Sequence, residues 1–318
     1  MTAATVLGLG HAVVDHVAWL PALPAADSKS NILRSQIQVG GPVPTALVLL
    51  SRWGVRTKFV GVVGDDPDGL RIIADLQREG VDPALIHRRR SMQTGFAHVW
   101  VEEGTGRRTV ASYRPERPVR PEEFLAGWLH RTQVLHLDGW PGETAIQAAT
   151  VARDAGVTVT LDAGSVRPGM GQLLPLVDVL TGPERFALDF CGTQDLPKAA
   201  AQLLNLGPRA VFLTRGEEGA SAWSADLESG ASPRVWHQPA LQVSAVDTNG
   251  AGDTFAGAIV FGVLSGWSVS RMLQVATIAA GLKCAGAGNR SALPDLSQVL
   301  AHSDKHDGIR DDDVAALQ

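Results

Sequence analysis

The chain has 318 residues with 28 Lys and Arg against 33 Asp and Glu, a net charge of −5. This balance excludes a global basic field that would attract nucleic acid or an anionic membrane, and no uncharged apolar stretch reaches the ~20 residues of a membrane-spanning helix. Only Cys191 and Cys284 are present, and residues 1–10 lack a basic start followed by a long apolar region, so we expect a reduced, cytoplasmic protein.

The N-terminal elements alternate between strand and helix. Thr5 to Gly10 is a short apolar run that predicts a buried strand, and Gly41 to Trp53 predicts a helix. Arg56 to Gly64 predicts the next strand, and Asp66 to Glu79 a charged helix that ends before a glycine.

The same alternation returns after residue 130. The predicted strands are Gln133 to Leu137, Val157 to Leu161, Val177 to Thr181 and Arg209 to Thr214, and the predicted helices are Thr144 to Ala155 and Leu196 to Leu206. This order predicts one α/β domain over residues 1–318, with a mostly parallel sheet and helices on both faces. Ligands of such sheets bind beyond the carboxyl ends of the strands.

Two segments interrupt the alternation, at residues 11–39 and 95–113. In the second, Phe96 to Val101 and Arg108 to Ala111 flank the turn sequence Glu103-Gly104-Thr105-Gly106, a pattern typical of a β-hairpin. Strands outside the main alternation predict a small accessory sheet that covers the site as a lid.

A glycine-rich motif lies in the C-terminal third, Asp247-Thr248-Asn249-Gly250-Ala251-Gly252-Asp253, followed by the helix-compatible run Thr254 to Leu264. A glycine turn that opens a helix presents free N–H groups and a positive dipole end, which favour an anion. Asp253 adds a carboxylate beside this anion site. Together they favour phosphoryl transfer to a hydroxyl group over the alternative, a glycine-rich helix contact capped by Asp253. Because the chain has no G-x-x-x-x-G-K-[ST] loop, residues 250–252 are the candidate phosphate element.

This motif resembles the D-T-x-G-A-G-D signature of the ribokinase-like, phosphofructokinase-B-type carbohydrate kinases. Gly40-Gly41 with Ala46 and Gly54, then residues 61–66 and Gly69, resemble the N-terminal signature of the same family. The resemblance implies a three-layer α/β/α core with a small β-sheet lid and an ATP-dependent carbohydrate kinase. It also implies that Asp253 accepts the proton of the sugar hydroxyl, while Gly250, Ala251 and Gly252 offer backbone N–H groups to the phosphate.

The resemblance also indicates residues for the sugar. Asp15 matches the position that holds sugar hydroxyls, with an exposed loop acid as the alternative, and Gly40 and Gly41 fit a close backbone approach to the sugar. Thr45 stands where sugar kinases often carry asparagine, so it is a substrate-binding candidate that changes which oxygens can be reached. Arg167 follows a predicted strand and is a candidate for a substrate carboxylate or phosphate, with a surface arginine as the alternative.

Nucleotide and metal candidates follow from the same resemblance. The segment Thr214 to Gly219, through Thr214, Gly216 and Gly219, is similar to the T-x-G-x-x-G nucleotide loop, and Asn289 lies in a segment similar to the one around adenine. Glu184 stands in a partial N-x-x-E motif that organises Mg²⁺ through water, with a surface helix acid as the alternative. Main-chain oxygens near Asp247 and Asn249 are candidate ligands for K⁺.

We therefore expect a carbohydrate kinase that uses ATP and Mg²⁺, with K⁺ activation left open. Two alternatives stay open, a nucleoside kinase of the same superfamily and a sugar or nucleotide sensor without activity. Because exposed edges of accessory sheets invite pairing, we also expect a homodimer.

Overall fold

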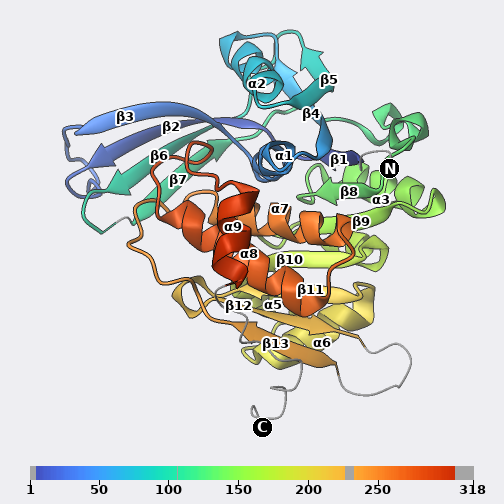
Figure 1. Cartoon of the computed structure of the whole chain (residues 1–318). Coiled ribbons are helices and arrows are strands. Elements are labelled where there is room, and N and C mark those ends of the chain that lie inside the picture. The colour runs from blue at the N-terminus through green and yellow to red at the C-terminus, as the bar shows by residue number, and fades with distance from the viewer. Residues whose placement is uncertain (1–4, 106, 226–232, 305–318) are drawn as a thin grey trace.

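The computed structural model describes residues 5–105, 107–225 and 233–304, and these form a large and a small β-sheet with helices around the large one (Figure 1). The large sheet has the strand order β13-β12-β11-β10-β9-β8-β1-β4-β5. Its strands are β1 Thr5–Leu9, β4 Arg56–Gly64, β5 Val81–Arg89, β8 Val134–Leu137, β9 Thr158–Asp162, β10 Val179–Pro183, β11 Ala210–Thr214, β12 Ala220–Ser224 and β13 Arg234–Gln238. The pairs from β5 to β11 are parallel, and β12 and β13 continue the sheet antiparallel.

Helices cover both faces of this sheet. The helices that pack around one core are α1 Pro42–Arg52, α2 Pro67–Arg78, α7 Ala251–Leu264, α8 Val269–Cys284 and α9 Leu296–Asp304, and those around the other are α3 Gly142–Asp154, α4 Met170–Leu173, α5 Glu184–Cys191 and α6 Leu196–Leu206. Successive side chains of one strand enter opposite cores, as Val6 and Leu7 of β1 do. The three-layer α/β/α fold predicted from the sequence is therefore confirmed. No helix in the described part of the chain is long and apolar enough to cross a membrane.

The strand order reverses at β1. From β1 the chain proceeds to β4 and β5 on one side and then returns to β8 on the other side. A crevice forms at the carboxyl ends of the strands where such an order reverses, and ligands of open α/β sheets bind there.

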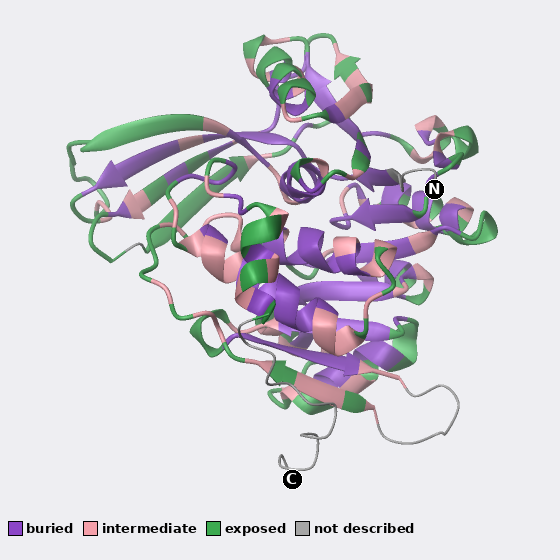
Figure 2. Ribbon diagram, in the orientation of Figure 1, coloured by how far each residue is buried: buried purple, intermediate pink, exposed green. Residues whose placement is uncertain are grey.

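The small sheet projects from the large one in the upper left of Figure 1 and has the order β3-β2-β6-β7. Its strands are β2 Val13–Leu20, β3 Arg34–Gly40, β6 Phe96–Glu102 and β7 Arg108–Tyr113. The two segments that interrupt the sequence alternation supply all four strands, and the parallel pair β2–β6 joins one segment to the other. Figure 2 shows that β3 is mostly exposed while the neighbouring β2 is buried.

Several elements are additional to those expected from the sequence, among them β5, α4, α5, β12, β13 and α9. β5 forms one edge of the large sheet and carries a proline and four charged or histidine side chains, so its composition hides it. β13 forms the opposite edge and has exposed positions at Arg234 and His237. Edge strands bury less of their surface than central ones and therefore lack the continuous apolar run that identified the others.

Candidate active site

The head of α7 carries the glycine-rich turn. Gly250 immediately precedes the helix with φ +82°, a left-handed conformation that glycine adopts without strain. A Cβ atom on Gly250 would lie 2.0 Å from Oδ1 of Asn289, so conformation and packing both require glycine here. The first N–H groups of a helix have no partner within it, so the turn can present donors at the start of α7. The Ala251 N–H donates to the main-chain oxygen of Thr248 at 3.3 Å in this structure.

Asp253 lies in the first turn of α7, because the helix begins at Ala251, three residues earlier than the apolar run indicated. Burial, with a smaller contribution from the charge of Asp138, raises the pKa of Asp253 to about 6, and the charges of Arg108 and Lys283 oppose the shift. A hydrogen bond from Thr45 also opposes it. The carboxyl group is therefore ionised at neutral pH and close to the pKa that suits a general base.

Asp15 and the two glycines lie at the junction of the two sheets. Asp15 is buried on β2, paired with Gln38 of β3, and a Cβ on Gly40 would lie 2.4 Å from its Oδ2. Gly41 has φ +108°, and a Cβ there would lie 2.1 Å from the main-chain oxygen of His11. Burial raises the pKa of Asp15 to about 7, and the Asp253 charge contributes to the shift. The structure thus brings Asp15 close to Asp253 although 238 positions separate them in the chain.

Two further carboxyl groups, Asp138 and Asp162, join this cluster. Asp138 follows β8 beside β1; its Oδ2 accepts the His11 N–H at 2.8 Å and its Oδ1 accepts the Trp140 N–H at 2.9 Å. Asp162 ends β9, and burial raises its pKa well above the ordinary value, with Asp253 and Asp138 adding to the shift. In the sequence, Asp138 and Asp162 each stand at the end of a predicted central strand, and this position could have identified both as site residues.

Arg114 and Arg167 are the positive charges that act on this carboxylate cluster. Burial, together with the charges of Arg114 and Arg167, lowers the pKa of His11 to about 3, so the imidazole is neutral. The Nη1 of Arg167 is buried and has no hydrogen-bond partner among the described residues. Burial lowers the pKa of Arg114, and the adjacent Arg167 charge contributes. Two guanidinium groups whose charges act on the same carboxylate cluster are suited to an anion.

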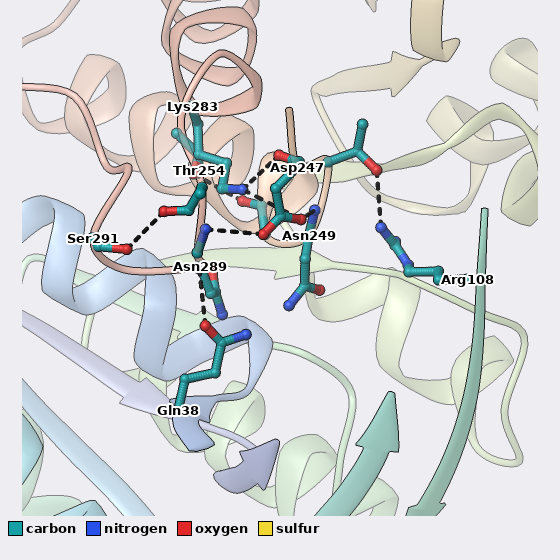
Figure 3. Close-up of polar contacts among 12 residues, drawn as sticks. Gln38, Arg108, Asp247, Asn249, Thr254, Lys283, Asn289 and Ser291 are labelled. Carbon is teal, nitrogen blue, oxygen red and sulfur yellow. Dashed lines mark hydrogen bonds and ion pairs between the residues drawn. The ribbon is translucent and has the colours of Figure 1, made fainter. Parts of the chain in front are cut away.

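Thr45 and Asn289 lie behind the reacting groups. Thr45 is fully buried in α1, donates to Asp253 and accepts from Nδ2 of Asn289 at 3.3 Å. Asn289 is 2% exposed, and its N–H donates to Oε1 of Gln38 at 3.1 Å (Figure 3). Both side chains contact protein groups that surround the turn, whereas the resemblance indicated substrate for Thr45 and nucleotide for Asn289.

Two cavities meet beside the turn, and Glu217, Ala245 and Thr248 line both of them. One lies between the small sheet and residues 245–249, and Val17, Trp19, Gln38, Val99 and Arg108 line it. The other, about 550 Å³, extends from the turn to α8 and is lined by Thr214, Gly216, Gly219, Leu241, Val243, Gly252, Phe255 and Ala280. All three candidates of the Thr214 to Gly219 segment therefore border one mixed polar and apolar cavity, although this segment is also a turn between antiparallel strands.

Arg108 reaches the turn from the small sheet, and its Nη1 donates to Oγ1 of Thr248 at 2.9 Å (Figure 3). Its charge opposes the raised pKa of both Asp15 and Asp253. The sequence made Arg108 a candidate for substrate recognition, but it did not predict the contact with Thr248, because 140 residues separate the two.

The metal candidates have protein partners. Oε2 of Glu184, the first residue of α5, accepts from Nε of Arg215 at 3.1 Å. The main-chain oxygen of Asp247 accepts from Nζ of Lys283 at 2.7 Å, and Oδ1 of Asp247 accepts from the Asn249 N–H at 2.8 Å. No group of three or more His, Cys, Asp or Glu side chains in the described ranges is arranged to hold a metal ion.

Comparisons with known proteins identify the family and the fold. A family model described as pfkB family carbohydrate kinase matches residues 4–296. The chain is 28% identical to the ATP-dependent ribose-1-phosphate kinase of Halopiger xanaduensis, over 93% of this chain and 97% of that protein, and 25% identical to the ribokinase of Haemophilus influenzae, with the same coverage. The structure of Arabidopsis thaliana ribokinase complexed with ribose and ATP superposes with a TM-score of 0.80 at 24% identity, over 95% of this chain and 99% of that one.

Proposed function

The chain belongs to the pfkB family of carbohydrate kinases, and on this premise we propose that it transfers the γ-phosphate of ATP to a hydroxyl group of a sugar or sugar derivative. The observation that carries the proposal is the position of Asp253. Its carboxylate, with a pKa of about 6, lies at the head of α7 beside the Gly250 turn and near Asp15. A base and an anion site thus adjoin one acceptor position.

In this mechanism Asp15 accepts hydrogen bonds from the acceptor and orients it. Asp253 takes the proton of the attacking hydroxyl as the phosphoryl group is transferred, and Thr45 holds the Asp253 carboxylate in place. The N–H groups at residues 250–252 donate to the phosphoryl oxygens as their charge grows. Arg108 of the small sheet donates to Thr248 and so joins the small sheet to the turn when the acceptor is bound. Closing the small sheet over the acceptor excludes water, which otherwise competes for the phosphoryl group.

The second cavity suits the nucleotide. Its apolar side chains on α7 and α8 fit a base, and the Thr214 to Gly219 turn together with Gly252 fits the phosphates. Mg²⁺ would neutralise charge on the phosphates when bound. Because this ion keeps several waters and needs only one or two carboxylates, the absence of a three-ligand cluster from the described residues is compatible with it. Glu184 is the candidate side chain, and it would exchange its ion pair with Arg215 for the hydrated ion.

The arginine pair supports an acceptor that carries a negative group, such as a sugar phosphate or a sugar acid. Arg114 and Arg167 adjoin the strand ends at His11 and Asp138, near the carboxylates that would hold the sugar. The charges of Arg114 and Arg167 disfavour each other and Asp138 compensates Arg114 in part, so a phosphate or carboxylate that accepts from both guanidinium groups would add favourable contacts. The ribose-1-phosphate kinase of H. xanaduensis acts, by its name, on a substrate of this kind.

A panel of acceptors tests the proposal. Purified protein is assayed for ADP release with ribose, ribose 1-phosphate, sugar acids and adenosine, and we expect the anionic sugars to give the highest kcat/KM. Arg167→Met should lower kcat/KM for anionic acceptors by about 10- to 100-fold and leave neutral acceptors unchanged. Turnover of adenosine above every sugar would favour the nucleoside kinase instead. Thermal stabilisation by ligands without ADP release would favour the sensor.

We also propose a homodimer formed through the outward face of the small sheet. Ile37 and Trp100 are 47% and 42% exposed, and the strand register places them on the face opposite the first cavity. Light scattering should give twice the monomer mass for the wild type and the monomer mass for Trp100→Glu. A monomeric wild type at assay concentration would exclude this arrangement. The cytoplasmic location stays a prediction.

A further inference from the structure

Lys283, in the last turn of α8, is a buried cation. Its side chain is 0% exposed, and its Nζ donates to the main-chain oxygen of Asp247 at 2.7 Å and lies 4.0 Å from Oδ1 of the same residue (Figure 3). An ammonium group is costly to bury unless an anion and hydrogen bonds compensate it. Asp247, the first residue of the glycine-rich motif, supplies both: its main-chain oxygen accepts the hydrogen bond and its carboxylate is the anion.

Asp247 in turn joins three segments. Its Oδ1 accepts from the Asn249 N–H, and its Oδ2 accepts from the Gly288 N–H at 3.0 Å. Its own N–H donates to the main-chain oxygen of Cys284 at 3.2 Å, beside Lys283. The segment that leads into Gly250 is therefore attached to the end of α8 and to the loop after it, and the ammonium group lies at this junction.

The charge of Lys283 acts through the turn on the reacting groups. It is one of the two cations that oppose the raised pKa of Asp253, the other being Arg108. Arg108 approaches from the small sheet and is exposed, whereas Lys283 is held within the large domain behind the turn. A fixed cation on this side stabilises negative charge at the turn with no rearrangement during the reaction.

We propose that Lys283 is a built-in monovalent cation: its ammonium group occupies the Asp247 main-chain oxygen, positions the turn at residues 248–250 and makes phosphoryl transfer independent of K⁺. The proposal rests on the proposed kinase function. It replaces the expectation that K⁺ binds main-chain oxygens near Asp247 and Asn249, because one of these oxygens already has a cationic partner. An ammonium group carries the same charge as K⁺ and has three directed donors, so it serves as a permanent substitute.

The first test needs no variant. Turnover of the best acceptor is measured with tetramethylammonium as the sole monovalent cation and again with added KCl at constant ionic strength. We expect the same turnover in both. Saturable activation of the wild type by KCl would overturn the proposal.

The second test removes the charge. Lys283→Met keeps the length of the side chain without its ammonium group, and Lys283→Ala leaves room for an ion. In tetramethylammonium, we expect kcat to fall about 10- to 100-fold, the loss expected for a charged hydrogen bond, with a smaller change in KM. KCl or NH₄Cl should restore part of the turnover of Lys283→Ala. Lys198→Met, at an exposed position of α6, is the matched control and should behave as the wild type.

A third measurement separates this inference from the kinase assignment. Thermal unfolding of the same proteins should show that KCl raises the Tm of Lys283→Ala saturably and leaves the Tm of the wild type unchanged. If no acceptor is phosphorylated, the proposed function fails while this measurement still tests the cation site. A loss of turnover in folded Lys283→Ala that neither KCl nor NH₄Cl reverses, with no Tm response, would reduce Lys283 to a packing role and overturn the proposal.

Discussion

The large and small sheets both contribute to the proposed phosphate site, but they hold their side chains in different ways. Asp253 belongs to α7, whose Phe255, Ala258 and Ile259 are buried in a core shared with α1 and α8. Arg108 belongs to an edge strand of the small sheet. Among the described residues, the buried cluster of that sheet comprises Val17, Trp19, Ala97 and Val99, with Val101 packed against it. A small apolar cluster contributes little free energy of stabilisation against local opening. We therefore expect the small sheet to move away at low cost while Asp253 keeps its position on α7.

This difference separates the chemical step from recognition. Substitutions at the head of α7 should lower kcat for every acceptor, whereas substitutions on the small sheet should change KM and the ranking of acceptors. Each prediction below tests one side of that division.

The largest effect is expected from Asp253→Asn, which keeps the shape and removes the base. We expect kcat to fall about 10²- to 10⁴-fold with every acceptor. Because the folded-state pKa of about 6 lies above the ordinary value of 3.8, the ionised carboxylate destabilises the fold above pH 6, and this penalty is absent below 3.8. The variant should therefore unfold at an equal or higher temperature than the wild type at about pH 8. Near-normal turnover would remove Asp253 from the mechanism.

Gly250→Ala tests the anion turn. The added Cβ would meet Oδ1 of Asn289 and would force a left-handed conformation on alanine. We expect kcat to fall about 100-fold, with a lower Tm by differential scanning fluorimetry. Gly156→Ala is the matched control, since Gly156 also has a positive φ, +68°, but a Cβ there meets no atom within 4 Å and the residue follows α3. Equal losses in the two variants would show that the turn geometry is not the cause.

Arg108→Ala tests the small sheet. Removing a charged partner of Thr248 should lower kcat/KM about 10- to 100-fold. The Tm should not change, because Arg108 is exposed. Arg108→Lys keeps the charge and should recover most of the loss. If Arg108→Ala lowers kcat alone and equally for all acceptors, the division between the two sheets fails at this residue.

The smallest effect is expected from pH. Asp253 must be ionised to accept a proton, so kcat should rise with pH through about 6 and be about tenfold lower at about pH 5 than at its plateau. Asp15 has a pKa of about 7, so kcat/KM should also rise with pH through about 7 as Asp15 ionises. Asp15→Asn should remove this second rise. If kcat were the same at about pH 5 as at its plateau, ionisation of Asp253 would not control turnover and Asp253 would not be the base.

The sequence predicted the central elements well because burial on both faces leaves long apolar runs. β4 has the predicted bounds Arg56–Gly64, and α6 has the predicted bounds Leu196–Leu206. Edge strands such as β5 lack that signal. The turn at residues 250–253 was visible as a motif, but its partners depend on distant contacts: Arg108 and Thr248 are 140 residues apart, and Lys283 reads as an ordinary charged helix position until its burial against Asp247 is known.

The parallel pairing of β2 with β6 has a consequence for how this enzyme can diversify. The segment from β2 to β3 and the segment from β6 to β7 each leave the large domain and return to it. By connectivity, each segment, called a cassette below, could be exchanged without altering α7. However, Asp15 faces Ala97 and Val17 faces Val99 across that pair, so exchanging one cassette alone would mismatch the shared register. New acceptor ranges should therefore arise when both cassettes are inherited or grafted together.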